Sequence, residues 1–94
     1  EKKITPKTKA ILPVHLNGQM VDMKKLLLIA RKQKISVIED AAHALEAARD
    51  GIRPGQESFG ACFSFYATKS ITSGEGGAFA TNNKSIAKLV KKLR

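Results

Sequence analysis

Apolar and polar positions along the 94-residue chain follow two periods, one typical of strands and one typical of helices. Apolar runs at 9–14, 35–40 and 59–67 predict three strands, and residues 76–81 predict a shorter fourth one. Residues 21–33 place apolar side chains on one helical face and basic side chains on the other, which predicts a helix. A second amphipathic stripe predicts a helix from Ser85 to the end of the chain.

A strand, a helix and a strand within about thirty residues indicate the βαβ unit of a parallel sheet. We therefore predict an α/β fold with a mostly parallel sheet and flanking helices. Residues 41–48, "AAHALEAA", predict a short helix, and the turn signals that follow it predict a loop over 49–58. Four strands with so few covering helices make an incomplete two-sided layer, so we expect residues 1–94 to be a segment of a larger domain.

The chain is strongly basic, with 17 Lys and Arg against 8 Asp and Glu and a formal net charge of +9. Such a charge is typical of small basic proteins that bind nucleic acids, which is one candidate function. The basic residues nevertheless fall in separate clusters, and two of these lie on the outer faces of the predicted helices. Solvated surface charge is therefore favoured over a nucleic-acid interface, which stays as the alternative.

The single cysteine, Cys62, excludes an internal disulfide and a cysteine-based zinc site. Because it lies in an apolar run, we expect a buried free thiol. No stretch of the chain has the length and apolarity of a membrane span, and the first residues lack the apolar core of a signal peptide. We therefore expect a cytoplasmic protein without a membrane partner.

Polar side chains follow three of the predicted strands: His15 the first, Asp40 the second, and Ser64 to Lys69 the third. In open α/β sheets ligands bind beyond the carboxyl ends of the strands, so these residues are candidates for a site. Asp40 has a structural alternative as the cap of the 41–48 helix. A metal site from Asp40, Glu39 and His43, with His15 as a further ligand, matches no strong ligand spacing, and we expect no metal.

Lys69 follows an aromatic strand and has few charged neighbours in the sequence, so we expect it to be partly desolvated. Desolvation favours the neutral amine, the form that attacks carbonyl groups and forms Schiff bases. A carboxylate at a neighbouring strand end, such as Asp40, could hold a protonated ring nitrogen, as pyridoxal phosphate chemistry requires. Ser64 and loop amides could contact a phosphate, although "SGEGG" matches no nucleotide-binding glycine pattern.

Three segments, "ILPVHLNGQMVDM", "VIEDAAHALEA" and "FSFYATKSITSGEGGAFATNN", resemble the DegT/DnrJ/EryC1/StrS family in order and spacing. Members of this family are aminotransferases that depend on pyridoxal 5'-phosphate, act on nucleotide-linked keto sugars and have the fold-type I architecture of aspartate aminotransferase. The resemblance runs from Ala10 to Arg94. It implies that residues 1–94 are a fragment of the cofactor-binding large domain, without a complete second domain.

The resemblance also implies a role for each matching residue. Lys69 would form the internal aldimine with the cofactor and would later carry the proton between cofactor and substrate. Asp40 would bind the pyridine nitrogen, His43 would lie near the ring hydroxyl, and Ser64 would hydrogen-bond the phosphate. His15 would lie close to the site without a step of its own.

By the same resemblance, the enzyme would transfer an amino group, with glutamate as donor, and would work as a homodimer. Relatives that dehydrate sugars carry histidine in place of the lysine, so Lys69 favours transamination. Asn17 stands where the family usually has an aromatic residue and Glu46 where glycine is frequent. We expect the fragment alone to be inactive, and a non-catalytic regulatory relative is a further alternative.

Overall fold

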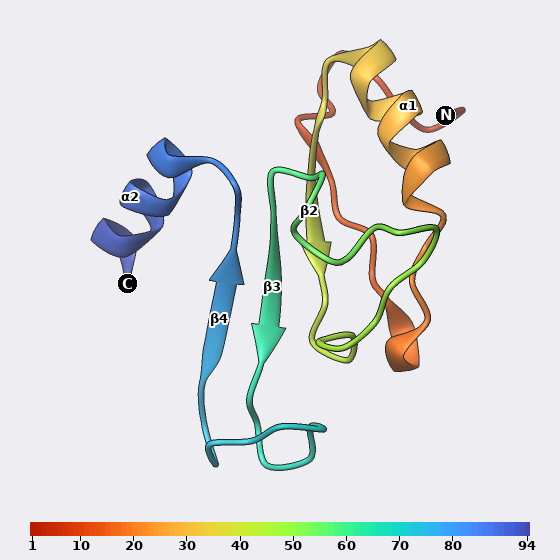
Figure 1. Cartoon of the computed structure of the whole chain (residues 1–94). Coiled ribbons are helices and arrows are strands. Elements are labelled where there is room, and N and C mark those ends of the chain that lie inside the picture. Colours follow the sequence, from red (N-terminus) through yellow and green to blue (C-terminus); the bar gives the residue numbers. More distant parts are fainter.

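One four-stranded sheet organises the chain, and the computed structural model describes all of residues 1–94 (Figure 1). The strand order is β1-β2-β3-β4, in which β1 and β2 and then β2 and β3 pair in parallel, whereas β4 runs antiparallel to β3. The predicted α/β class with a mostly parallel sheet is confirmed. The elements are β1 (Ala10–Ile11), a 3-10 turn (Leu16–Gly18), α1 (Met23–Gln33), β2 (Ser36–Asp40), β3 (Gly60–Ser64), β4 (Gly77–Ala80) and α2 (Lys84–Leu93).

Helix α1 supplies three of the five residues of the larger core cluster. Asp22 caps its first turn by accepting a hydrogen bond from the Lys25 backbone N–H at 3.1 Å. Its inward face packs on β2, so that one sheet face is covered. The core cluster consists of Met20, Met23, Leu27, Ala30 and Val37.

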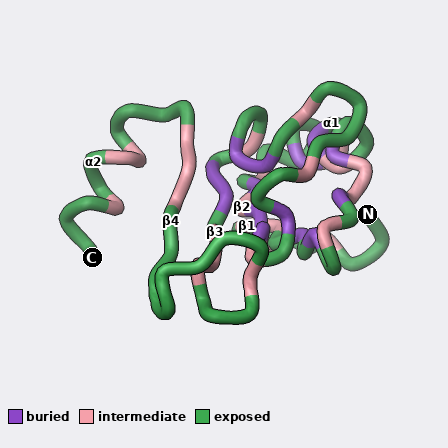
Figure 2. Tube along the Cα trace, turned by 60° about the horizontal axis from the view of Figure 1, so that its bottom comes forward, coloured by how far each residue is buried: buried purple, intermediate pink, exposed green.

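Helix α2 begins where Asn83 accepts hydrogen bonds from the backbone N–H groups of Ser85 and Ile86. The predicted helix is confirmed, and it starts one residue earlier than expected. None of its residues is buried, and Figure 2 shows that the buried positions gather around α1, β2 and β3 rather than α2. Neither helix is long and apolar enough to cross a membrane.

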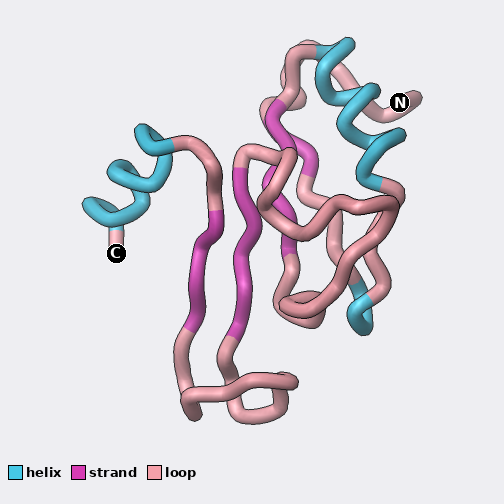
Figure 3. The backbone as a smooth tube through the Cα atoms, viewed as in Figure 1, coloured by secondary structure: helices cyan, strands magenta, loops and turns pink.

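The helix predicted over 41–48 is wrong, because this segment forms turns (Figure 3). The Asp40 carboxylate accepts from the Ala42 N–H at 3.0 Å, and the Ala44 N–H donates to the Ala41 carbonyl three residues earlier. These short-range bonds replace the bonds of an α-helix. The small side chains of Ala41 and Ala44 then pack tightly against Ala61 of β3.

The first strand is shorter than the predicted 9–14, with a separate bridge between Val14 and Asp40. The sheet face opposite α1 is open, and Leu12 and Val14 on it are 65% and 52% exposed. The expectation that Cys62 is buried is also wrong. Cys62 pairs in register with Asp40 and so lies on this open face.

Candidate functional site

The carboxyl ends of β2 and β3 lie side by side. Asp40 is opposite Cys62 in the parallel register, and Ser64 is two residues beyond Cys62. Because side chains alternate along a strand, Asp40, Cys62 and Ser64 belong to the same sheet face. The sheet therefore brings two of the predicted site residues to one edge and one face.

The loop that carries Lys69 is closed at its base by hydrogen bonds to one residue, Phe65. The Phe65 N–H donates to the Gly76 carbonyl at 2.8 Å, and the Phe65 carbonyl accepts from Thr72 Oγ1 at 2.9 Å and from the Ser73 N–H at 3.0 Å. Gly76 has a φ of 154°, and a Cβ there would lie 2.7 Å from Ser73 Oγ. Glycine at position 76 therefore suits the backbone that closes this loop between β3 and β4.

A cavity of about 430 Å³ lies at these strand ends. Its wall comes from the turn after β1, the turns after β2 and the loop after β3, and it includes Asn17, Gly18, His43, Glu46, Ser64 and Lys69. Asp40 does not line the cavity, although the backbone N–H that its Oδ1 binds belongs to Ala42, which does. Three of the predicted residues, His43, Ser64 and Lys69, therefore line the cavity. Asp40 does not, but it is hydrogen-bonded to Ala42, which lines it.

Lys69 is half-buried. It takes part in none of the ion pairs of the chain, so its amino group is not neutralised by a neighbouring carboxylate. Ser64 Oγ accepts from the Tyr66 N–H at 3.3 Å, which leaves the hydroxyl hydrogen available to donate. The cavity thus offers a lysine amine and a hydroxyl donor.

The opposite wall depends on a left-handed turn at Asn17 and Gly18, whose φ angles are 52° and 79°. A Cβ on Gly18 would lie 3.2 Å from the carbonyl oxygen of His43, so glycine allows this turn to approach the segment after β2. His43 itself is exposed. The close approach of Gly18 to the His43 carbonyl therefore brings the backbone of these two segments together.

Partial burial, and then the negative charge of Asp40, raise the pKa of the Cys62 thiol above its ordinary value. This shift agrees with the register that puts the two side chains on one face. Asp40 and Cys62 are therefore neighbours on the open face of the sheet.

Glu39 and His15 form a buried pair that the sequence reasoning missed. The His15 and Glu39 side chains are fully buried, and His15 Nε2 lies 2.6 Å from Glu39 Oε2. The available signal was the alternation in "SVIED", which places Glu39 on the same inward face as Val37. Asp40 points to the opposite face, so the metal site considered from Glu39 and Asp40 is not assembled, and no group of three potential ligands exists.

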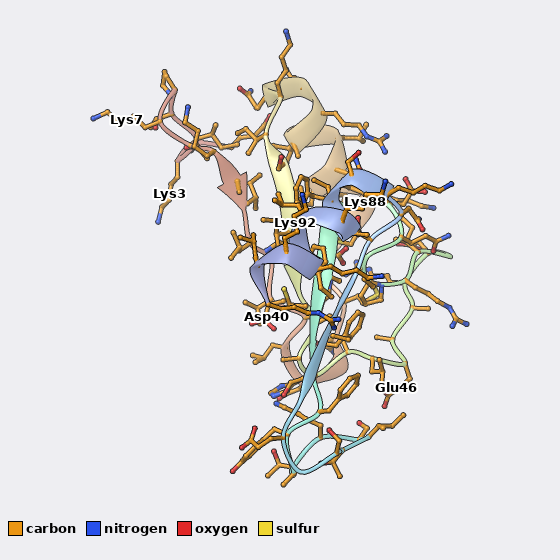
Figure 4. The ribbon with its side chains drawn as sticks, turned by 90° about the vertical axis from the view of Figure 1, so that its left-hand side faces the viewer. Lys3, Lys7, Asp40, Glu46, Lys88 and Lys92 are labelled. Carbon is orange, nitrogen blue, oxygen red and sulfur yellow. The ribbon has the colours of Figure 1, made fainter.

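Two of the basic clusters lie at different sides of the sheet. Lys3 and Lys7 project from the N-terminal segment, whereas Lys88 and Lys92 lie on α2 at the other side of the sheet (Figures 1 and 4). A nucleic-acid backbone is bound by a continuous basic patch or stripe. The arrangement therefore favours solvated surface charge.

Comparison with known proteins identifies the family. The model of the DegT/DnrJ/EryC1/StrS aminotransferase family matches residues 1–94. GDP-perosamine synthase of Caulobacter vibrioides is 48% identical over 94 residues, which are 100% of this chain and 25% of that protein. The chain spans about a quarter of the length of the curated relatives it matches.

Solved structures agree in fold. DesV of S. venezuelae, in complex with a ketimine intermediate, matches with a TM-score of 0.93 and 42% identity over 99% of this chain and 25% of that one. NtdA of Bacillus subtilis, with bound cofactor PMP, matches with a TM-score of 0.83 and 39% identity over 93% of this chain and 19% of that one. With its full length matched by the family model, the chain belongs to the DegT/DnrJ/EryC1/StrS aminotransferase family.

Proposed function

We propose that residues 1–94 are part of the cofactor-binding large domain of an enzyme that transfers an amino group to a nucleotide-linked keto sugar with pyridoxal 5'-phosphate. The observation that carries this proposal is the shared cavity of Lys69, Ser64 and His43 at the carboxyl ends of β2 and β3. Family membership and relatives such as GDP-perosamine synthase support the reaction and the class of substrate.

The residues present fit the cofactor in chemical type. A carbonyl group needs an amine, a phosphate needs hydrogen-bond donors, and a pyridinium nitrogen needs a carboxylate. Lys69 supplies the amine, Ser64 the hydroxyl donor, and Asp40 a carboxylate that uses only its Oδ1 within the chain. When bound, the cofactor supplies an electron sink that stabilises negative charge on the carbon bearing the amino group.

Each side chain then has a task of its own. Lys69 would hold the cofactor covalently, and its amine, once free, would take and return the proton of the substrate carbon. Asp40 would bind the ring nitrogen and keep it protonated through a charge-assisted hydrogen bond. Ser64 would hydrogen-bond the phosphate, and His43 would lie near the ring hydroxyl.

The finer assignments complete the proposal. By the family resemblance, glutamate is the amino donor, and the working enzyme is a homodimer in the cytoplasm. The 94 residues alone are proposed to be inactive, because they correspond to about a quarter of the length of the relatives. No separate observation favours the nucleic-acid or regulatory alternative.

The test uses the full-length protein that contains these residues. Pyridoxal phosphate is added, the visible spectrum is recorded, and the adduct is reduced with borohydride and located by peptide mapping. The expected result is a label on Lys69 alone, which disappears in Lys69→Ala together with amino transfer to a nucleotide-linked keto sugar. The matched control is Lys88→Ala, since Lys88 lies on α2 outside the cavity. Transfer that survives Lys69→Ala would refute the proposal.

A further inference from the structure

We propose that the buried Glu39–His15 pair is a positioning element that fixes Asp40 for the cofactor, so that His15 and Glu39 act on the reaction through Asp40. This inference rests on the proposed function, and it gives a role to two buried titratable residues that the proposed chemistry does not use. Neither residue lines the cavity. Their influence must therefore pass through the end of β2.

Glu39 is the point where three separate segments meet. Its Oε2 accepts from His15 Nε2 at 2.6 Å, and its Oε1 accepts from the Gly55 N–H at 2.8 Å and from Ser58 Oγ at 2.5 Å. On the other side of the imidazole, Nδ1 accepts from the Val21 N–H at 3.2 Å. These contacts assign the Nε2–H tautomer to a neutral His15 and an ionised carboxylate to Glu39, since every partner of Glu39 is a donor.

The backbone of Asp40 is held by the same segment that carries His15. The Asp40 N–H donates to the Pro13 carbonyl at 2.9 Å, and the His15 N–H donates to the Asp40 carbonyl at 3.0 Å. Both main-chain groups of Asp40 are thus bound to residues 13–15. The His15 side chain adds a third link, to Glu39, so the segment grips two consecutive residues at the strand end.

These contacts matter because Glu39 and Asp40 are consecutive carboxylates, of which only one can face inward. Adjacent residues of a strand point to opposite faces, so a slip of one residue would turn Glu39 outward and Asp40 inward. The donors from His15, Gly55 and Ser58 all lie on the inward side and match the reach of a glutamate at position 39. Asp40 therefore faces the open side with its Oδ2 uncommitted.

Stability alone does not explain the buried Glu39–His15 pair. A buried ionised carboxylate costs free energy that its hydrogen bonds only offset, and an apolar core of similar volume is often as stable or more so. Removing a single partner leaves part of the charge uncompensated. The pair is thus suited to specifying one arrangement of the strand end, rather than to adding stability.

The test compares two substitutions at His15 in the full-length protein. In His15→Asn the amide oxygen can take the place of Nδ1 and keep the Val21 bond, but no donor reaches Glu39. In His15→Gln the amide nitrogen takes the place of Nε2 and restores that donor. The measurements are the dissociation constant of pyridoxal phosphate for the apoprotein and the ¹⁵N chemical shift of its labelled pyridine nitrogen, which reports protonation of the ring.

For His15→Asn we expect the dissociation constant of pyridoxal phosphate to rise about tenfold. Mutating the hydrogen-bond partners of metal ligands weakens metal affinity by a similar factor. We also expect its ¹⁵N shift to move toward that of the unprotonated ring. His15→Gln should restore both values toward those of the wild type. Leu27→Ala is the control for lost stability alone, because it opens a cavity in the α1 core without touching the pair. It should lower the melting temperature and leave the ¹⁵N shift unchanged.

Two outcomes would overturn the inference alone: an unchanged ¹⁵N shift in His15→Asn, or the same changes in Leu27→Ala as in His15→Asn. If His15→Asn does not fold, Ser58→Ala removes another donor of Glu39 and is judged by the same two measurements. A wild-type protein that binds no pyridoxal phosphate overturns the proposed function, and this inference with it. Binding in the wild type with no effect in the variants overturns the positioning role only.

Discussion

Gly60 of β3 lies directly beneath the ring of Phe79 of β4. A Cβ added to Gly60 would lie 2.2 Å from Phe79 Cζ and 2.8 Å from both Cε atoms. Carbon atoms in contact are about 3.5–4.0 Å apart, so the ring would have to move by more than about 1 Å. Phe79 is half-buried, and moving its ring outward gives up packing on β3.

The substitution Gly60→Ala should therefore destabilise the protein by about 1–3 kcal/mol, the usual cost of overpacking. The backbone of Gly60 does not explain such a loss, because its φ is outside the left-handed region. At such a position, replacing glycine by alanine stabilises a protein by about 0.4–1 kcal/mol through the unfolded state. In a Phe79→Ala background, Gly60→Ala should consequently be neutral or stabilising.

The assay is equilibrium urea unfolding of the wild type, both single variants and the double variant. The free energies of unfolding form a double-mutant cycle, for which we expect a coupling of about 1–3 kcal/mol. If Gly60→Ala costs the same in both backgrounds, the contact with Phe79 is not the reason for glycine at this position. The packing of β4 on β3 would then need another explanation.

Two further predictions concern charge. Hydrogen bonds from the backbone and side chain of Lys25 hold the pKa of Asp22 below its ordinary value. The ionised Asp22 therefore stabilises the folded protein fully at pH values above that ordinary pKa. This stabilisation is lost as the pH falls through the lowered pKa of the folded state. Asp22→Asn should reduce the acid dependence of unfolding measured by circular dichroism, and an unchanged acid profile would contradict this. Burial, and then the charge of Asp40, raise the pKa of Cys62, so Asp40→Asn should lower that pKa and speed alkylation of the thiol by iodoacetamide at pH 8. Alkylation that is unchanged or slower would show that the two side chains are not close.

The local elements followed from the sequence where local physics decides them. The apolar periodicity of 21–33 and of the last ten residues marked both helices, and Asp22 and Asn83 cap them where capping side chains are expected. The candidate site was visible for a related reason. Polar residues after buried strands gather at the carboxyl edge of a parallel sheet, and Ser64 and Lys69 do so.

The segment after Asp40 shows where local signals fail. "AAHALEAA" has the composition of a helix, yet Asp40 accepts a hydrogen bond from the Ala42 N–H and the alanines pack on β3. Helix propensity amounts to a few tenths of a kcal/mol per residue, and tertiary packing overrides it. The exposure of Cys62 was missed for the same reason, because an apolar run does not reveal which sheet face will be covered.

By itself the sequence determined the order of elements, the α/β class, the family resemblance and the residues able to react, because periodicity, capping and motif spacing are local properties. Only the tertiary structure decided which of two adjacent carboxylates turns inward. Glu39 meets donors from residues that lie 24, 16 and 19 positions away, and Asp40 is left to face outward. Strand pairing and side-chain alternation set that choice, and both depend on contacts between segments distant in the chain.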